Sequence, residues 1–243
     1  PITNALPIGT ILTLAATGSE MNSGAVISNL DTKQKLGFAH PSMAPKFSIL
    51  DPSYTFTVPK AQTAAGVADI MSHTLENYFT LDEGTYLQDR LAEAILKTCI
   101  QYGKKAIQEP EDYEARANLM WASSLAINGL LSYGKDTFWS VHAMEHELSA
   151  YYDITHGVGL AILTPPWMEY VLDDERLDKF VEYGTNVWGI DRMKDKYDIA
   201  KESIEKTYDF FLSLGIPMSL GEVGIGEENL EDMAKAAIKH KGG

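Results

Sequence analysis

Two pairs of residues four apart carry the side chains best suited to chemistry in this sequence. Asp69 and His73 form the first pair, and His142 and His146 form the second. At the spacing of an α-helix, the two side chains of a pair rise from one face, one turn apart. His156 follows the second pair, in a loop just before another helical pattern. Five candidate side chains therefore come from a few short segments.

A divalent metal requires several such groups to converge. Imidazole together with a carboxylate suits Zn²⁺ or Fe²⁺. Because both pairs are flanked by apolar residues, we expect them to face the interior rather than the solvent. The pattern therefore favours a metal site between packed helices.

Two other interpretations remain open. In the first, Asp69 and His73 form a buried ion pair and His142 is a hydrogen-bonded core residue of a non-catalytic helical module. In the second, His142, Glu145 and His146 form the H-x-x-E-H pattern of a zinc metallopeptidase, in which the glutamate activates water. The peptidase pattern leaves three of the five candidates without a role, so we favour an interpretation that uses them all.

The elements that must position these residues are helices. From Pro59 onward, apolar residues recur at helical spacing and predict about eight helices. Their expected ranges are 59–79, 84–108, a helix starting at about 110, and then 136–152, 158–172, 174–188, 196–214 and 227–240. Cys99 lies on the apolar stripe of the second helix and is predicted to be a core residue.

The first 58 residues follow a different pattern. Short β-branched runs predict strands at 9–14, 25–28 and 47–50, too few to bury a core of their own. Small and hydroxyl residues fill 13–20, where a turn could approach a phosphate or ribose, or could simply bond locally. Lys33 and Lys35 could supply a cation to a phosphate, or could be solvated turn lysines.

Composition narrows the possible partners. The chain has 243 residues and a net charge of −14, which disfavours nucleic acid and anionic membranes as partners. No apolar run reaches the roughly 18–20 residues of a membrane-spanning helix. The single cysteine permits no internal disulfide and suits a reducing compartment such as the cytoplasm.

Four segments in order, 13–20, 50–52, 66–73 and 142–157, resemble the iron-containing (group III) alcohol dehydrogenases. The resemblance is greatest to the butanol dehydrogenase and NADPH-dependent aldehyde reductase branch. It implies a two-domain fold, α/β plus all-α, of the dehydroquinate synthase type. Residues 1–58 would be part of a Rossmann-like αβ dinucleotide-binding domain, and 59–243 an all-helical metal-binding catalytic domain.

The resemblance also implies site residues. The divalent metal, Fe²⁺ or Zn²⁺, would lie in the cleft between the domains, bound by Asp69, His73, His142 and His156. His146 would lie near the nicotinamide and relay a proton, in keeping with the near-neutral titration of an ordinary imidazole. The implied cofactor contacts are Thr13, Leu14, Thr17, Asn22, Lys35 and Tyr54.

The implied activity is hydride transfer between NAD(P)(H) and a primary alcohol or aldehyde, in a cytoplasmic homodimer or larger homo-oligomer. Phe138, Trp139 and Tyr151 are candidates for lining an apolar substrate pocket. Family members carry a Gly-Gly-Gly-Ser turn upstream of the strand expected at 9–14, and these residues contain no such turn. We therefore expect the 243 residues by themselves to bind NAD(P) poorly.

Overall fold

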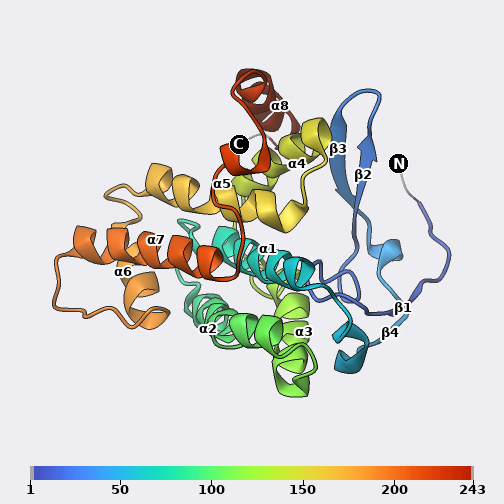
Figure 1. Cartoon of the computed structure of the whole chain (residues 1–243), viewed down its shortest axis with the longest axis horizontal. Helices are drawn as coiled ribbons and strands as arrows, with labels where there is room; N and C mark the ends of the chain where they lie inside the picture. Colours follow the sequence, from blue (N-terminus) through green and yellow to red (C-terminus); the bar gives the residue numbers. More distant parts are fainter. Residues whose placement is uncertain (1–2, 242–243) are drawn as a thin grey trace.

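The computed structural model describes residues 3–241, in which a β-rich segment precedes a body of helices (Figure 1). The strands are β1 Gly9–Ile11, β2 Gly24–Asn29, β3 Gln34–Ala39 and β4 Phe47–Ile49. Strand β1 pairs with β4 in parallel, with Gly9 opposite Phe47. Strands β2 and β3 form an antiparallel hairpin, with Gly24 opposite Ala39. The hairpin stands at one side of the helical body.

The predicted strands are confirmed in place, but β1 is shorter than expected and β3 was not expected at all. Strand β3 contains no β-branched residue and has Gly37 at its centre, so its local sequence does not favour a strand. Its hydrogen bonds to β2 form it instead. As a result, Lys35 lies within a strand rather than in a turn.

The predicted helices are confirmed with ends moved by a few residues. They are α1 Lys60–Tyr78, α2 Tyr86–Gln108, α3 Tyr113–Ile127, α4 Ser140–Tyr152, α5 His156–Val171, α6 Leu177–Asn186, α7 Lys196–Ser213 and α8 Leu230–Lys241. Short 3₁₀ turns are η1 Pro41–Met43, η2 Pro52–Thr55 and η3 Gly221–Val223. His156 is the first residue of α5, not a loop residue as expected. Over the described residues, none of the helices is long and apolar enough to cross a membrane.

Helix α1 is the centre of the fold. Every residue from Thr63 to Tyr78 is buried, and the helix packs against α2, α3 and α5 (Figure 1). Small residues allow this close packing: a Cβ at Gly66 would lie 2.6 Å from the carbonyl oxygen of Ala15. Because α1 is surrounded, its polar residues Asp69 and His73 are buried as well.

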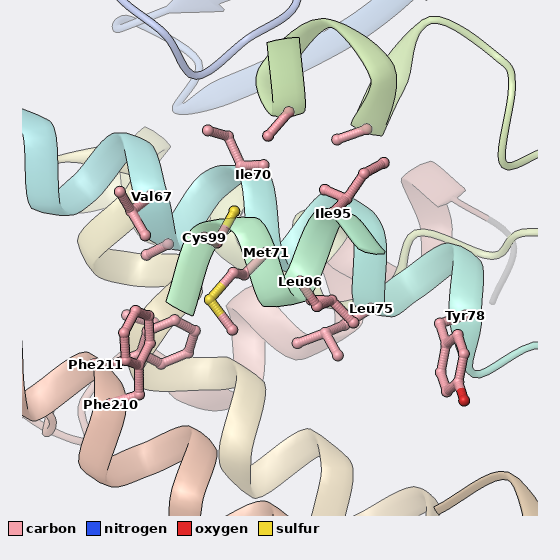
Figure 2. Close-up of a cluster of buried hydrophobic side chains, with 14 of the residues drawn as sticks. Val67, Ile70, Met71, Leu75, Tyr78, Ile95, Leu96, Cys99, Phe210 and Phe211 are labelled. Atoms are coloured by element: carbon pink, nitrogen blue, oxygen red, sulfur yellow. The ribbon is translucent and has the colours of Figure 1, made fainter. Parts of the chain in front are cut away.

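The hydrophobic core combines residues of α1 with residues of α2, α3, α5, α6 and α7. Figure 2 shows Met71 and Leu75 of α1 beside Leu96 of α2, with Phe211 of α7 nearby. Cys99 lies in the same cluster, which confirms its prediction as a core residue. Burial raises the pKa of its thiol, so this cysteine is unreactive.

Candidate metal centre

Three histidines converge on one carboxylate oxygen. His73 Nε2 lies 3.4 Å from Asp69 Oδ1, and the Nε2 atoms of His142 and His156 each lie 3.7 Å from it. Helix α1 supplies Asp69 and His73, α4 supplies His142, and the first turn of α5 supplies His156. All four predicted side chains thus lie around Asp69 Oδ1, but only the ligand atoms of Asp69, His142 and His156 lie within 4.8 Å of one another, and His73 joins them through its contact with Asp69.

These distances suit metal ligands better than hydrogen bonds. A good N–H···O bond spans about 2.7–3.2 Å, whereas two ligands about 2.1 Å from a tetrahedral ion lie about 3.4 Å apart. Asp69 Oδ1 and His142 Nε2 are buried and have no hydrogen-bond partner among the described residues. Buried polar atoms without partners are rare because they destabilise the fold. A divalent ion such as Fe²⁺ or Zn²⁺ fits this set of donors.

The protonation states of Asp69 and His73 suit metal ligands. Burial lowers the pKa of His73 to about 3, despite the attraction of the Asp69 carboxylate. Burial would raise the pKa of Asp69, but the surrounding imidazoles, His73 foremost, lower it to about 2. At neutral pH the pair is therefore a carboxylate beside a neutral imidazole, which are the ligand forms.

A second carboxylate, Glu76, lies behind His142. Its Oε1 accepts a hydrogen bond from the backbone N–H of Val141 at 2.7 Å, and its Oε2 accepts one from the backbone N–H of His142 at 3.3 Å. The same Oε2 contacts Nδ1 of the His142 ring. Burial would lower the pKa of His142, but the charge of Glu76 and the contact with Asp69 raise it to about 9. The sequence analysis missed Glu76, although its position three residues after His73 places both on one face of α1.

Glu145 lies behind His156 in the same way. It is fully buried, and its carboxylate contacts Nδ1 of His156 and the Ser149 hydroxyl. Lys35 of β3 donates a hydrogen bond to Glu145 Oε2 at 3.2 Å and another to Ser149 Oγ at 2.9 Å. Burial would raise the pKa of Glu145, but these contacts lower it.

This arrangement gives no support to the peptidase interpretation, which assigns Glu145 the activation of water. Ligand atoms of Glu145, His146 and His156 do lie within 4.8 Å of one another. However, the Lys35 ammonium lies 3.4 Å from His156 Nδ1 and is hydrogen-bonded to Glu145. A cation already fills the space beside these atoms.

His146 lies beside His156, with ring centroids 5.8 Å apart. Burial, and then the charge of Lys35, lower its pKa to about 3. The expected near-neutral titration of His146 is therefore wrong in this environment. At neutral pH the side chain is a neutral imidazole on the wall of the cleft.

The cleft has a volume of about 730 Å³. Asp69 and four histidines line it, and so do Thr17, Asn22 and Lys35, three of the predicted cofactor contacts. Thr13, Leu14 and Tyr54 do not line it: Leu14 faces a separate small pocket, and Tyr54 is exposed on η2.

Of the three aromatic candidates for a substrate pocket, only Trp139 lines this cleft. Its ring meets those of His73 and His142 edge-on. Phe138 faces a different cavity of about 470 Å³, and Tyr151 lies beneath the Lys33 ammonium.

Known proteins share both this sequence and this fold. The chain is 69% identical over 242 residues to NADH-dependent butanol dehydrogenase A of Clostridium acetobutylicum, covering 100% of the chain and 62% of that protein. It is 41% identical over 239 residues to the NADPH-dependent aldehyde reductase YqhD of Escherichia coli, covering 98% of the chain and 61% of that protein. The chain thus spans about three fifths of the length of these relatives.

Solved structures agree with the sequence comparison. The crystal structure of Escherichia coli YqhD matches with a TM-score of 0.94 at 39% identity, over 98% of this chain and 61% of that one. The structure of NADH-dependent butanol dehydrogenase A from Thermotoga maritima matches with a TM-score of 0.92 at 39% identity, over 99% and 60%. The predicted two-domain fold with a helical C-terminal domain is confirmed.

Family models cover most of the chain. One described as the iron-containing alcohol dehydrogenase matches residues 1–52. Another, described as the C-terminal part of the Fe-containing alcohol dehydrogenase family, matches residues 63–243, which include all four converging side chains. The chain belongs to the iron-containing alcohol dehydrogenase family, as its four sequence segments predict.

Proposed function

We propose that the protein transfers a hydride between NADH or NADPH and a primary alcohol or aldehyde, at a Fe²⁺ or Zn²⁺ ion bound by Asp69, His73, His142 and His156. The convergence of three imidazole Nε2 atoms on Asp69 Oδ1 at the wall of a cleft is the observation that supports this most strongly. The names of the relatives, an NADH-dependent butanol dehydrogenase and an NADPH-dependent aldehyde reductase, support the same chemistry.

When bound, the metal supplies a Lewis acid that polarises the substrate oxygen, and the nicotinamide carries the hydride. The residues of the chain bind and orient these groups. Asp69 contributes the only anionic donor among the four, and its burial keeps water from competing for it. The Trp139 ring, edge-on to His73 and His142, gives the cleft an apolar surface beside the reacting atoms.

We assign residues 1–58 to the dinucleotide-binding domain and 59–243 to the catalytic domain. Thr17 and Asn22 on the cleft wall would contact the cofactor directly. Lys35 would do so from β3, where its ammonium is within reach of both the cleft and Glu145. Thr13, Leu14 and Tyr54 remain proposed contacts on the same side of the molecule.

His146 is proposed to relay the proton of the reaction. Its lowered pKa means that it does so as a neutral imidazole, accepting a hydrogen bond at one ring nitrogen while donating from the other. Such a group moves a proton along a chain of hydrogen bonds without storing it as an imidazolium ion at neutral pH.

We also propose a cytoplasmic homodimer or larger homo-oligomer. The family resemblance supports the assembly, and the single, buried Cys99 supports a reducing compartment. Light scattering of the purified protein tests the assembly, and a single copy at micromolar concentration would contradict it.

The activity is tested on the protein at its full natural length, loaded with Fe²⁺ or Zn²⁺. Oxidation of NADH and NADPH is followed by absorbance with butanal as substrate, beside the Asp69→Asn variant. We expect butanal-dependent oxidation by the wild type and its loss, by more than about 100-fold, in the variant. No oxidation by the loaded wild type, or equal rates in the two proteins, would refute the proposal.

A further inference from the structure

The two glutamates behind the ligand histidines are as buried as the ligands themselves. Glu76 is 5% exposed and Glu145 is 0% exposed. A buried carboxylate is costly to retain unless it is paired and hydrogen-bonded. Neither glutamate belongs to the proposed metal-binding set, so the fold must retain them for another reason.

Glu76 performs two tasks at the start of α4. Helix α4 begins after Trp139, which has a left-handed backbone (φ 56°) and makes no capping bond with its side chain. The Glu76 carboxylate, which comes from α1, accepts hydrogen bonds from the backbone N–H groups of Val141 and His142 and so caps the helix. Its Oε2 also contacts the His142 ring at Nδ1. The capping bonds and the ring contact fix both the position of the helix end and the orientation of the ring.

Glu145 has the same relation to His156. Its Oε2 contacts Nδ1 of His156, while the Nε2 of that ring points toward Asp69 Oδ1. Lys35 donates a hydrogen bond to the same Oε2, and the Ser149 hydroxyl donates one to Oε1, so both hold the Glu145 carboxylate in place. In both cases a carboxylate is found at Nδ1 and the shared carboxylate oxygen at Nε2.

Such contacts determine which ring nitrogen is free. A histidine that donates Nδ1–H to a carboxylate has its lone pair on Nε2, and the contact also fixes the plane of the ring. His73 has no such partner: its Nδ1 is buried without a hydrogen bond among the described residues. Two of the three histidines, His142 and His156, are therefore oriented by a carboxylate at Nδ1.

We propose that Glu76 and Glu145 are positioning residues that direct Nε2 of His142 and His156 toward the metal. The proposal rests on the metal site of the proposed function and deepens it. It assigns Glu145 a role outside peptidase chemistry and gives Glu76 a role beyond capping α4.

The test uses the metal-free chain titrated with Co²⁺, followed by its visible absorption and by competition with a chelator. The variants are Glu76→Gln, Glu76→Ala, Glu145→Gln and Glu145→Ala. Glu93→Gln is the control. Glu93 is also a buried carboxylate, but it accepts hydrogen bonds from Tyr78 and Arg90 and not from a histidine. Thermal unfolding of each metal-free variant is measured alongside.

We expect both alanine variants to bind Co²⁺ about 10–100-fold more weakly and to change its visible spectrum. The glutamine variants should recover part of the affinity, because an amide oxygen still accepts from Nδ1–H. Glu93→Gln should bind like the wild type. A glutamine variant that folds allows the test even where the alanine variant of the same residue does not fold.

Wild-type affinity and spectrum in the Glu76 and Glu145 variants, with lowered thermal stability, would overturn the proposal and leave the glutamates purely structural. Failure of the metal site itself gives a different result. In that case the wild type would bind no Co²⁺, or Asp69→Asn would bind it as tightly as the wild type.

Discussion

The helices that carry the metal-binding side chains are packed very differently from the strands that precede them. In α1, residues Thr63 to Tyr78 are all buried. In the β2–β3 hairpin, by contrast, Val26 is 51% exposed and Ile27 is 61% exposed. The proposed metal ligands Asp69 and His73 therefore lie on a buried helix, whereas much of the hairpin surface is exposed.

This difference indicates which contacts hold each part of the proposed site. The proposed metal-binding side chains are held by contacts within the helical body, mainly between α1, α4 and α5. The hairpin reaches that body chiefly through β3 and α4, where Lys35 bonds to Glu145. Metal binding should thus depend on the helical core, and nicotinamide binding on the placement of the strands.

The largest effect should come from the helical core. Phe211→Ala removes a ring with no exposed surface from the cluster in Figure 2, so we expect the free energy of unfolding to fall by about 3–5 kcal/mol. Val26→Ala in the exposed hairpin should change it by no more than about 0.5 kcal/mol. Urea denaturation measures both. Equal losses in the two variants would contradict the distinction between core and hairpin.

A smaller effect should follow from the contact between α5 and α1. A Cβ at Gly157 would lie 2.0 Å from the carbonyl oxygen of Ala65, so Gly157→Ala must push the two helices apart. We expect a loss of about 1–3 kcal/mol of stability, together with weaker metal binding, because His156 is the adjacent residue.

Gly221→Ala is the matched control, because a Cβ there would meet nothing within 4 Å. Its stability should stay within about 0.5 kcal/mol of the wild type. Metal affinity and urea denaturation are measured for both variants. A Gly157→Ala protein that matches the control in both would show that the close contact does not position His156.

A further effect concerns pH. The pKa values of His73 and His146 fall from the ordinary 6.5 to about 3 on folding. Above pH 6.5 both are neutral whether folded or not; as the pH falls from 6.5 toward 3, the unfolded chain takes up protons first and stability drops. Folding raises the pKa of His142 to about 9, so its titration lowers stability only at higher pH, as the pH rises from 6.5 toward 9.

Replacing His146 with Asn removes one of these titrations. The metal-free His146→Asn variant should therefore lose less stability than the wild type between pH 6.5 and about pH 4. Urea midpoints at several pH values measure this difference. Parallel curves for the two proteins would show that folding does not lower the pKa of His146.

The sequence predicted the helices well, because they depend on local spacing, whereas the set of four side chains came from the family resemblance. Asp69 and His73 lie one helical turn apart wherever α1 packs, and the resemblance supplied His142 and His156. Strand β3 escaped prediction because only its pairing with β2 makes it a strand. Contacts between distant helices, such as Glu76 with His142, depend on tertiary packing and leave no periodic signal.

The sequence also placed some side chains in the wrong chemical setting. The sequence allowed Glu145 to be assigned to water activation. In the structure Lys35, 110 residues away in the chain, is hydrogen-bonded to its carboxylate. His146 was expected to titrate near neutrality, but burial and the same lysine lower its pKa to about 3. Lys35, on the strand that was not predicted, contributes to both corrections.

The central claim, a metal site contained within the helical body, is tested most directly by elemental analysis of the purified chain after exposure to Fe²⁺ or Zn²⁺. The Asp69→Asn, His156→Ala and Glu145→Gln variants are analysed beside it. We predict one metal ion per chain, lost in the Asp69 and His156 variants and retained, with weaker affinity, in the Glu145 variant. Metal that survives the Asp69 and His156 substitutions, or no stoichiometric metal in the wild type, would contradict the claim.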